Sequence, residues 1–187
     1  MGRDKALLVF DGEPLLVRTV RLVESVAGPT TVIARPDDYR SLDLRVIGDD
    51  FPGAGPLGGI ATALRASQAP WNLIVACDLP YLTEKWLEHL IARARASRAD
   101  AVLPVSERGA EPLCAAYHKS GESAISAALA RGTRKVTDGL QALCVDSIEP
   151  AEWKAFDSDG MLFKNMNSPA DYEEAVARLS GRAKLSR

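Results

Sequence analysis

The sequence has 187 residues, of which 47% are hydrophobic and 26% charged, which predicts one globular domain with a substantial core. Its 23 Lys and Arg residues against 25 Asp and Glu residues give a formal net charge of -2, which argues against a general nucleic-acid binder. No stretch has the length of a membrane span and no leader pattern appears, so the sequence predicts a cytoplasmic protein. The odd number of widely spaced cysteines, Cys77, Cys114 and Cys144, predicts reduced core thiols in such a compartment.

Helical and strand patterns alternate along the chain, which predicts a mainly parallel sheet covered by helices on both faces. The predicted helices, in chain order, cover residues 14–27, about 59–69, 83–97, 120–130 and 169–179. The predicted strands cover residues 30–34, 44–47, 71–78, 100–105, 111–118 and 140–145. Residues 1–180 are expected to form a single domain, and the basic residues 181–187 a frayed tail.

Asp78 lies at the end of the apolar run 71–77 and directly before Leu79 and Pro80. Because Pro80 cannot donate to a sheet and disfavours helix at Leu79, the strand is predicted to stop at Asp78. Ligands of open α/β sheets bind at the carboxyl ends of the strands, so a carboxylate there suggests a site for Mg²⁺ and phosphate. The alternative is that Asp78 only caps the turn that follows.

Residues 53–58 read GAGPLG, a literal GxGxxG, with Asp78 about where a dinucleotide-binding acid belongs. A dehydrogenase is disfavoured because residues 49–52 separate the motif from the preceding strand and Pro56 removes a backbone donor. The motif is interpreted instead as a loop that wraps a small ligand near a helix N-terminus, or as a tight turn alone.

Five segments resemble, in order, motifs of the nucleotidyltransferases that act on the molybdenum cofactor. They are residues 1–8 (MGRDKALL), 55–60 (GPLGGI), 76–80 (ACDLP), 111–117 (EPLCAAY) and 163–171 (FKNMNSPAD). Each motif is weak alone, but the ordered set spans nearly the whole chain. The resemblance is closest to the guanylyltransferase branch. It implies a Rossmann-like three-layer α/β sandwich of nucleotidyltransferase type.

The resemblance implies transfer of GMP from GTP to molybdopterin, with release of pyrophosphate and with Mg²⁺ as cofactor. It also implies other cofactor-biosynthesis proteins or recipient molybdoenzymes as partners, and neither nucleic acid nor membrane. Two alternatives stay open. One is a related enzyme that uses CTP or another acceptor, and the other is a non-catalytic partner protein.

Carried over by residue, the resemblance places Lys5 on the triphosphate, where a point charge suits oxyanions. It makes Asp78 the Mg²⁺ ligand, with Asn165 or Asn167 supplying an amide oxygen. The expected nucleotide-binding residues are Lys5, Asp49, Gly55, Pro56, Leu57, Gly58 and Asp78. The competing interpretations are a solvated Lys5, a loop-closing Asp49, and turn or cap roles for the two asparagines.

Three further polar positions carry weaker signals. Arg134 and Lys135 resemble a family stretch near the acceptor, although a solvated turn is an equal alternative. His89 and His118 lack a partner pattern for catalysis and are interpreted as structural or exposed.

The sequence departs from the family pattern at its beginning. Family members open with a buried strand and a Gly-rich loop, Leu-Ala-Gly-Gly, that leads to Arg-Met-Gly, whereas Met1 matches the Met of that last motif. The strand belongs at the centre of the sheet and the loop cradles the nucleotide. Without them we expect a marginally stable monomer with exposed strand edges.

Overall fold

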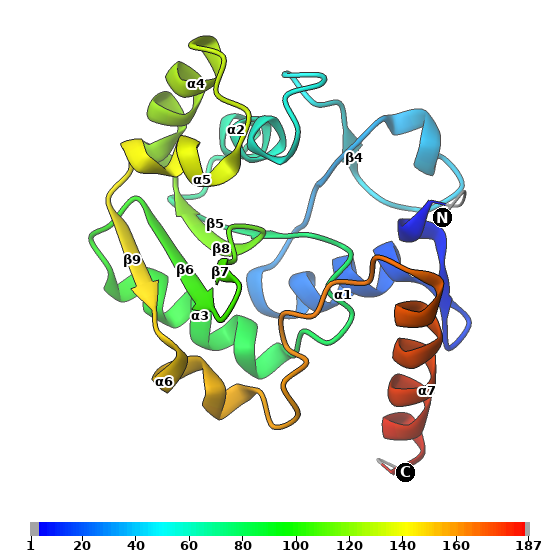
Figure 1. Cartoon of the computed structure of the whole chain (residues 1–187). Helices are drawn as coiled ribbons and strands as arrows, with labels where there is room; N and C mark the ends of the chain where they lie inside the picture. Colours follow the sequence, from blue (N-terminus) through cyan, green and yellow to red (C-terminus); the bar gives the residue numbers. More distant parts are fainter. Residues whose placement is uncertain (1–3, 186–187) are drawn as a thin grey trace.

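The central sheet of the computed structural model, which describes residues 4–185, has the strand order β5-β8-β6-β7, with β9 paired to β6 (Figure 1). Its strands are β5 (Trp71–Val75), β6 (Ala101–Ser106), β7 (Gly109–Ala110), β8 (Cys114–His118) and β9 (Val145–Ile148). β8 is antiparallel to both β5 and β6, while β9 is parallel to β6. Strands β5, β6 and β9 therefore run in one direction, and the predicted α/β fold with a mainly parallel sheet is confirmed.

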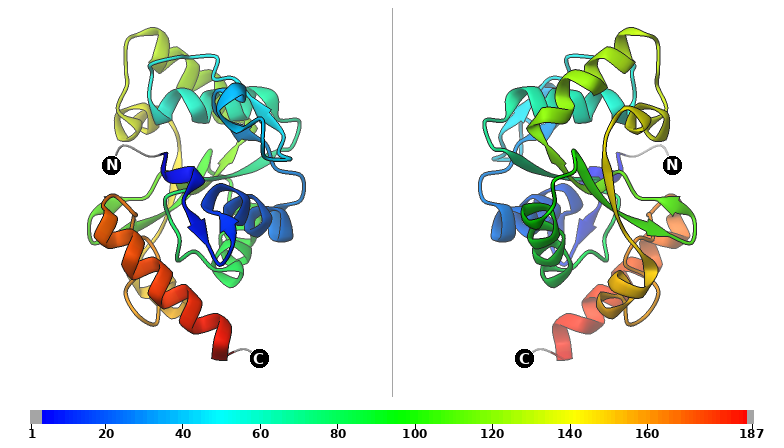
Figure 2. Two further views of the ribbon diagram at one scale, coloured as in Figure 1. Left: turned by 90° about the vertical axis from the view of Figure 1, so that its right-hand side faces the viewer. Right: turned by 90° about the vertical axis from the view of Figure 1, so that its left-hand side faces the viewer.

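Helices cover both faces of this sheet (Figures 1 and 2). α1 and α3 pack together on one face, and α2 packs with α4 and α5 on the other. The bounds are α1 (Leu15–Ala27), α2 (Pro56–Ala66), α3 (Glu84–Ala96), α4 (Glu122–Ala130), α5 (Val136–Gly139), α6 (Pro150–Trp153) and α7 (Pro169–Leu185). Along β8, Cys114 and Ala116 join the core with α3, whereas Ala115 and Tyr117 join the core with α2. This alternation of side chains creates the three layers.

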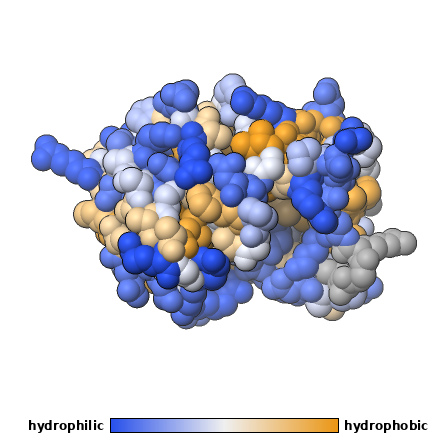
Figure 3. Space-filling view, turned by 90° about the horizontal axis from the view of Figure 1, so that it is seen from above, coloured by the Kyte–Doolittle hydropathy of each residue, from blue (hydrophilic) through white to orange (hydrophobic). Residues whose placement is uncertain are grey.

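Short one-turn helices connect the main elements. They are η1 (Lys5–Leu7), η2 (Pro36–Tyr39), η3 (Lys119–Gly121), η4 (Leu140–Ala142) and η5 (Lys154–Phe156). The residues predicted to bound two helices do so. Gly28 takes a φ of 83° where α1 ends, and the Thr83 hydroxyl accepts from the Trp86 N–H where α3 begins. No helix in the described part of the chain is long and apolar enough to cross a membrane. The face seen from above carries mostly hydrophilic side chains, with apolar ones visible between them (Figure 3).

A second parallel pair, β3 (Val32–Ile33) and β4 (Val46–Ile47), stands apart from the central sheet. Within residues 4–185, β4 is the only sheet partner of β3, and β8 is the only sheet partner of β5. Two strand edges are therefore left without a neighbour in the described sheet.

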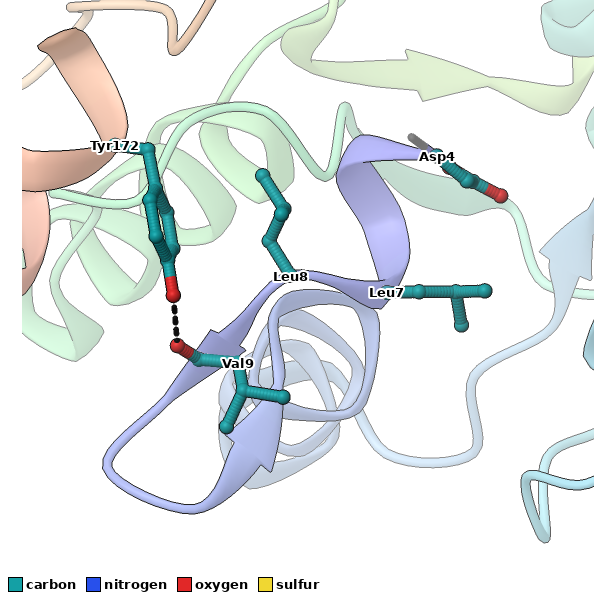
Figure 4. Close-up of a pocket in the computed structure, with 5 residues that line it drawn as sticks. All are labelled: Asp4, Leu7, Leu8, Val9 and Tyr172. Atoms are coloured by element: carbon teal, nitrogen blue, oxygen red, sulfur yellow. Dashed lines mark hydrogen bonds between the residues drawn. The ribbon is translucent and has the colours of Figure 1, made fainter. Parts of the chain in front are cut away.

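The first and last elements of the described chain pack against each other. The hairpin of β1 (Val9–Phe10) and β2 (Glu13–Pro14) contacts α7. There the Tyr172 hydroxyl donates to the Val9 carbonyl at 2.9 Å, beside a shallow pocket lined by Asp4, Leu7, Leu8, Val9 and Tyr172 (Figure 4). α7 continues to Leu185, so residues 181–185 extend the helix predicted to end at Leu179, and the last two residues of the predicted tail lie outside the described chain.

Three other predictions need correction. β5 ends at Val75, so Asp78 lies in the turn beyond the strand. Residues 140–145 do not form a strand, because Leu140 packs into the α2 core from η4 and the strand begins only at Val145. Cys144, in this same connection, is exposed and is not a core thiol.

Candidate active site

A groove of about 550 Å³ lies between β3 and β5. Helix α1 contributes Leu16, Val20 and Val23 to its lining, and α2 contributes Ile60 and Ala63. Asp4, Lys5 and Asp78 also line it, beyond the carboxyl end of β5. The groove therefore joins a long apolar interior to one charged end, and this end lies at the edge of the sheet where α/β folds bind ligands.

A capped turn presents Lys5 at the charged end. The Asp4 carboxylate accepts from the Ala6 N–H at 3.0 Å and from the Tyr39 hydroxyl at 2.8 Å, which fixes η1 at both sides. Lys5 Nζ then donates to Asn167 Oδ1 at 2.6 Å. Burial, followed by the hydrogen bond to Asp4, raises the pKa of Tyr39, so the phenol remains a donor. The prediction missed Tyr39 because it lies 35 residues from Asp4 and no local pattern links the two.

The segment around Asn167 also reaches Asp78. The Met166 N–H donates to the Asp78 carbonyl at 2.9 Å, so the segment that carries Asn167 runs beside Lys5 and Asp78. Asn167 itself is not among the groove's lining residues. The half-buried Asp78 carboxylate makes no hydrogen bond or ion pair with any residue of the described range. It is therefore open to a ligand from the groove.

Cys77 beside it is not suited to be a nucleophile. Burial, then the carboxylates of Asp78 and Asp4, raise its pKa to about 11, so the thiol stays protonated at neutral pH.

The structure places the other expected site residues differently. Asp49 Oδ1 accepts from the Thr62 hydroxyl at 2.8 Å and from the Phe51 N–H at 2.9 Å, which locks the loop before α2. Leu57 is fully buried in the core, and Gly58 packs against Phe51. Neither lines the groove by its own atoms, so a nucleotide contact of these two residues stays a prediction.

Pro56 does line the groove, at the first turn of α2, directly after Gly55. Gly55 has a φ of 66°, a left-handed conformation that explains the need for glycine. β4 ends at Ile47, well before the glycine motif at 53–58, so the strand-to-helix turn of a dinucleotide fingerprint is absent from this described segment.

The remaining polar candidates make local contacts. Arg134 Nη1 donates to the carbonyls of Leu129 and Thr133 at 3.1 and 2.9 Å, at the end of α4. His89 pairs with Glu152 at 2.8 Å, in agreement with a structural role. Asn165 is half-buried and is not among the groove's lining residues. Within the described residues no three His, Cys, Asp or Glu side chains cluster in a way that could hold a metal ion.

A three-layer α/β sandwich with a lysine and an open carboxylate at the carboxyl edge of its sheet has the architecture of a nucleotidyltransferase. The chain belongs to the MobA-like NTP transferase domain family, whose model matches residues 1–144. A probable molybdenum cofactor guanylyltransferase of Methanothermobacter thermautotrophicus is 32% identical over 182 residues, covering 91% of this chain and 90% of its own. A protein of the same description from Synechococcus elongatus is 32% identical over 183 residues, covering 92% and 90%. The predicted family is thus confirmed.

Solved structures agree on the fold. The molybdopterin-guanine dinucleotide biosynthesis protein A from Archaeoglobus fulgidus matches with a TM-score of 0.79 and 26% identity, over 96% of this chain and 92% of its own. The 2-C-methyl-D-erythritol 4-phosphate cytidylyltransferase from Thermus thermophilus matches with a TM-score of 0.67 at 19% identity, over 94% of each chain, and shares the fold alone.

Proposed function

We propose that this chain transfers GMP from GTP to the phosphate of molybdopterin in a Mg²⁺-dependent reaction that releases pyrophosphate. The observation that carries the proposal is the position of Lys5 and Asp78 at the charged end of the groove, with Asn167 bonded to Lys5 from the segment next to Asp78. The names of the curated relatives support the choice of substrates.

The donor set at this end suits a hard divalent cation. The Asp78 carboxylate is uncommitted among the described residues, and Asn167 adds an amide oxygen nearby. Mg²⁺ prefers such oxygens and needs few protein ligands beside phosphates and water. When bound, the ion would supply charge neutralisation on the phosphate oxygens. Since Lys5 occupies Asn167 Oδ1 in this structure, Asn167 becomes available when Lys5 turns to a phosphate.

The residues at the charged end of the groove have separate tasks in the proposed transfer. Lys5 holds the triphosphate through a charge-assisted hydrogen bond, and its ammonium opposes the negative charge that develops as the acceptor phosphate attacks the α-phosphorus. Asp4 and Tyr39 hold the turn that aims Lys5. The transfer needs no covalent enzyme intermediate, and the protonated Cys77 agrees with that.

The test measures pyrophosphate release from GTP and molybdopterin by Lys5→Met and Asp78→Asn variants. A charge-assisted bond contributes about 1.5–3 kcal/mol, so Lys5→Met should lower kcat/KM by roughly 10- to 150-fold. Asp78→Asn should lower it by at least about 100-fold because the metal anchor is lost. The matched controls are Lys85→Met and Asp43→Asn, which change exposed residues outside the groove.

Near-normal turnover of either site variant would overturn its assignment. Calorimetric titration with the four nucleoside triphosphates tests the base. Preferential binding of CTP would replace the guanylyl proposal with a cytidylyl one, and binding of none would favour the non-catalytic alternative.

A further inference from the structure

The segment that carries Asn165 and Asn167 has no regular structure of its own. Residues 164–167 lie between η5 and α7 and belong to no helix or strand. Two buried side chains anchor this stretch: Phe163 packs in the core with α3, and Met166 in the core with α7. Asn165 is half-buried and Asn167 is exposed. The placement of the two asparagines therefore depends on how the backbone around these anchors is held.

Arg108 reaches this backbone from another part of the fold. It lies in the two-residue turn between β6 and β7, and its Nη2 donates to the Phe163 carbonyl across 55 positions of sequence. Three residues after Phe163, the Met166 N–H donates to the Asp78 carbonyl at 2.9 Å. Asn165 thus lies between two backbone bonds that come from different elements.

The turn directs the guanidinium of Arg108. Because 59% of this side chain remains exposed, packing alone does not fix its direction. Glu111 Oε1 lies 3.7 Å from Arg108 Nη2 and accepts from the Ser106 hydroxyl at 2.6 Å. The Ser106 oxygen in turn accepts from the Arg108 N–H at 3.1 Å. Arg108 is therefore held in place before it contacts Phe163, as expected of a residue that supports a site.

We infer that Arg108 is a positioning residue that orients the segment 165–167 beside the charged end of the groove. The core fixes the ring of Phe163, but rotation of its carbonyl would change the direction in which the chain leaves toward Asn165. The charge-assisted bond from Arg108 holds that peptide plane. The use of the asparagines in catalysis rests on the proposed function, whereas the hold on the backbone can be measured without substrates.

The experiment compares Arg108→Ala with the unmodified chain and with Glu107→Gln, which changes the other residue of the same turn. Glu107 pairs with Lys154 at 3.5 Å, away from the Phe163 carbonyl. Without substrates, hydrogen exchange of the Met166 amide should be at least about tenfold faster in Arg108→Ala and unchanged in Glu107→Gln. The amides of Asn72 and Ile74, on the side of β5 that pairs with β8, serve as internal references.

Kinetics then connect this hold to the transfer. Small misplacements of reacting groups cost up to about 10²-fold, so Arg108→Ala should lower kcat by about 10- to 100-fold. KM for GTP should change by less than about twofold, because Lys5 holds the triphosphate in the proposed function. Millimolar guanidinium, far below denaturing concentrations, should restore part of the rate of Arg108→Ala and none of that of Asp78→Asn.

An unchanged exchange rate of the Met166 amide in Arg108→Ala would overturn the inference. So would equal acceleration at Asn72 and Ile74, because it reports a general loss of stability. Faster exchange at Met166 with an unchanged kcat would refute the positioning role.

A second variant covers the case in which Arg108→Ala does not fold. Glu111→Gln leaves Arg108 in place and removes the charge that faces it, so it should speed the Met166 amide less than Arg108→Ala does, and no acceleration would count against the inference. An unmodified chain that releases no pyrophosphate from GTP and molybdopterin would refute the proposed function instead. The exchange of the Met166 amide would still decide whether Arg108 holds the segment.

Discussion

Removing the Thr62 hydroxyl tests whether Asp49 contacts the nucleotide or only holds the loop before α2. Thr62 is 2% exposed on α2, where its Oγ1 donates to Asp49 Oδ1 at 2.8 Å and accepts from the Asp50 N–H at 3.0 Å. Thr62→Val keeps the shape of the side chain and deletes both bonds. It therefore tests the lock on the loop without touching any atom of the groove.

The structure sets the size of the effect. The variant removes the partner of the part-buried Asp50 N–H and one of the two donors to Asp49 Oδ1, which costs about 1–3 kcal/mol. For a domain of this length each kcal/mol corresponds to about 2–4 °C, so Tm should fall by about 2–12 °C. Thr62→Ser keeps the hydroxyl, so its Tm should fall by less than that of Thr62→Val. Calorimetry and urea titration measure both variants.

A double-mutant cycle with Asp49→Ala separates the two roles. If Asp49 is a loop lock, the two substitutions are coupled in stability and KM for GTP stays close to that of the unmodified chain. A Thr62→Val variant that melts within about 1 °C of the parent would refute the reasoning. So would an Asp49→Ala variant with a strongly raised KM and no coupling to Thr62, because that pattern belongs to a ligand contact.

Tyr39→Phe removes the hydroxyl that holds η1, so the free energy of unfolding in urea should fall by about 0.5–1.5 kcal/mol. KM for GTP should rise more than kcat falls, and an unchanged stability with an unchanged KM would contradict this role. The pKa of Asp100 is lowered by hydrogen bonds from the Ser120 hydroxyl and the Cys144 N–H. The carboxylate therefore stabilises the fold fully above its unfolded-state pKa, and this stabilisation is lost as the pH falls through the lower pKa of the folded state. Asp100→Asn should therefore cost stability at pH 7 and progressively less below 3.8, and a pH-independent difference in acid titrations would contradict this. Iodoacetamide should label exposed Cys144 first, and buried Cys114, whose pKa burial raises to about 12, only after unfolding; equal rates by mass spectrometry would refute the burial assignment.

Local signals predicted the elements that depend on local chemistry. Thr83 and Gly28 mark helix ends through their own side chain or backbone freedom, and both act where the sequence placed them. The strand at Val145 was misplaced because Leu140 and Leu143 have the apolar character of a strand, while their packing against α2 and α4 holds them outside the sheet. Tertiary contacts override local propensity there.

The candidate site was predictable only as a set of separate residues. The resemblance named Lys5, Asp78 and Asn167, and the structure brings Lys5 and Asp78 to one end of the groove and bonds Asn167 to Lys5. It did not indicate the support from Tyr39, because that contact depends on how η2 folds over η1. Nor could it separate Asp49 from the ligand residues, since an acid before a Gly-rich loop serves a lock and a ligand equally well.

The hydrogen bond between Lys5 and Asn167 has a consequence for the timing of synthesis. The two residues are 162 positions apart, and Asn167 lies beyond the residues 1–144 that match the family model. At about 5–20 residues per second, a ribosome makes Asn167 roughly 8–30 seconds after Lys5. For that whole interval the lysine has no asparagine to hold it. The bond that holds Lys5 at the charged end of the groove is therefore formed late, after most of the scaffold has been made.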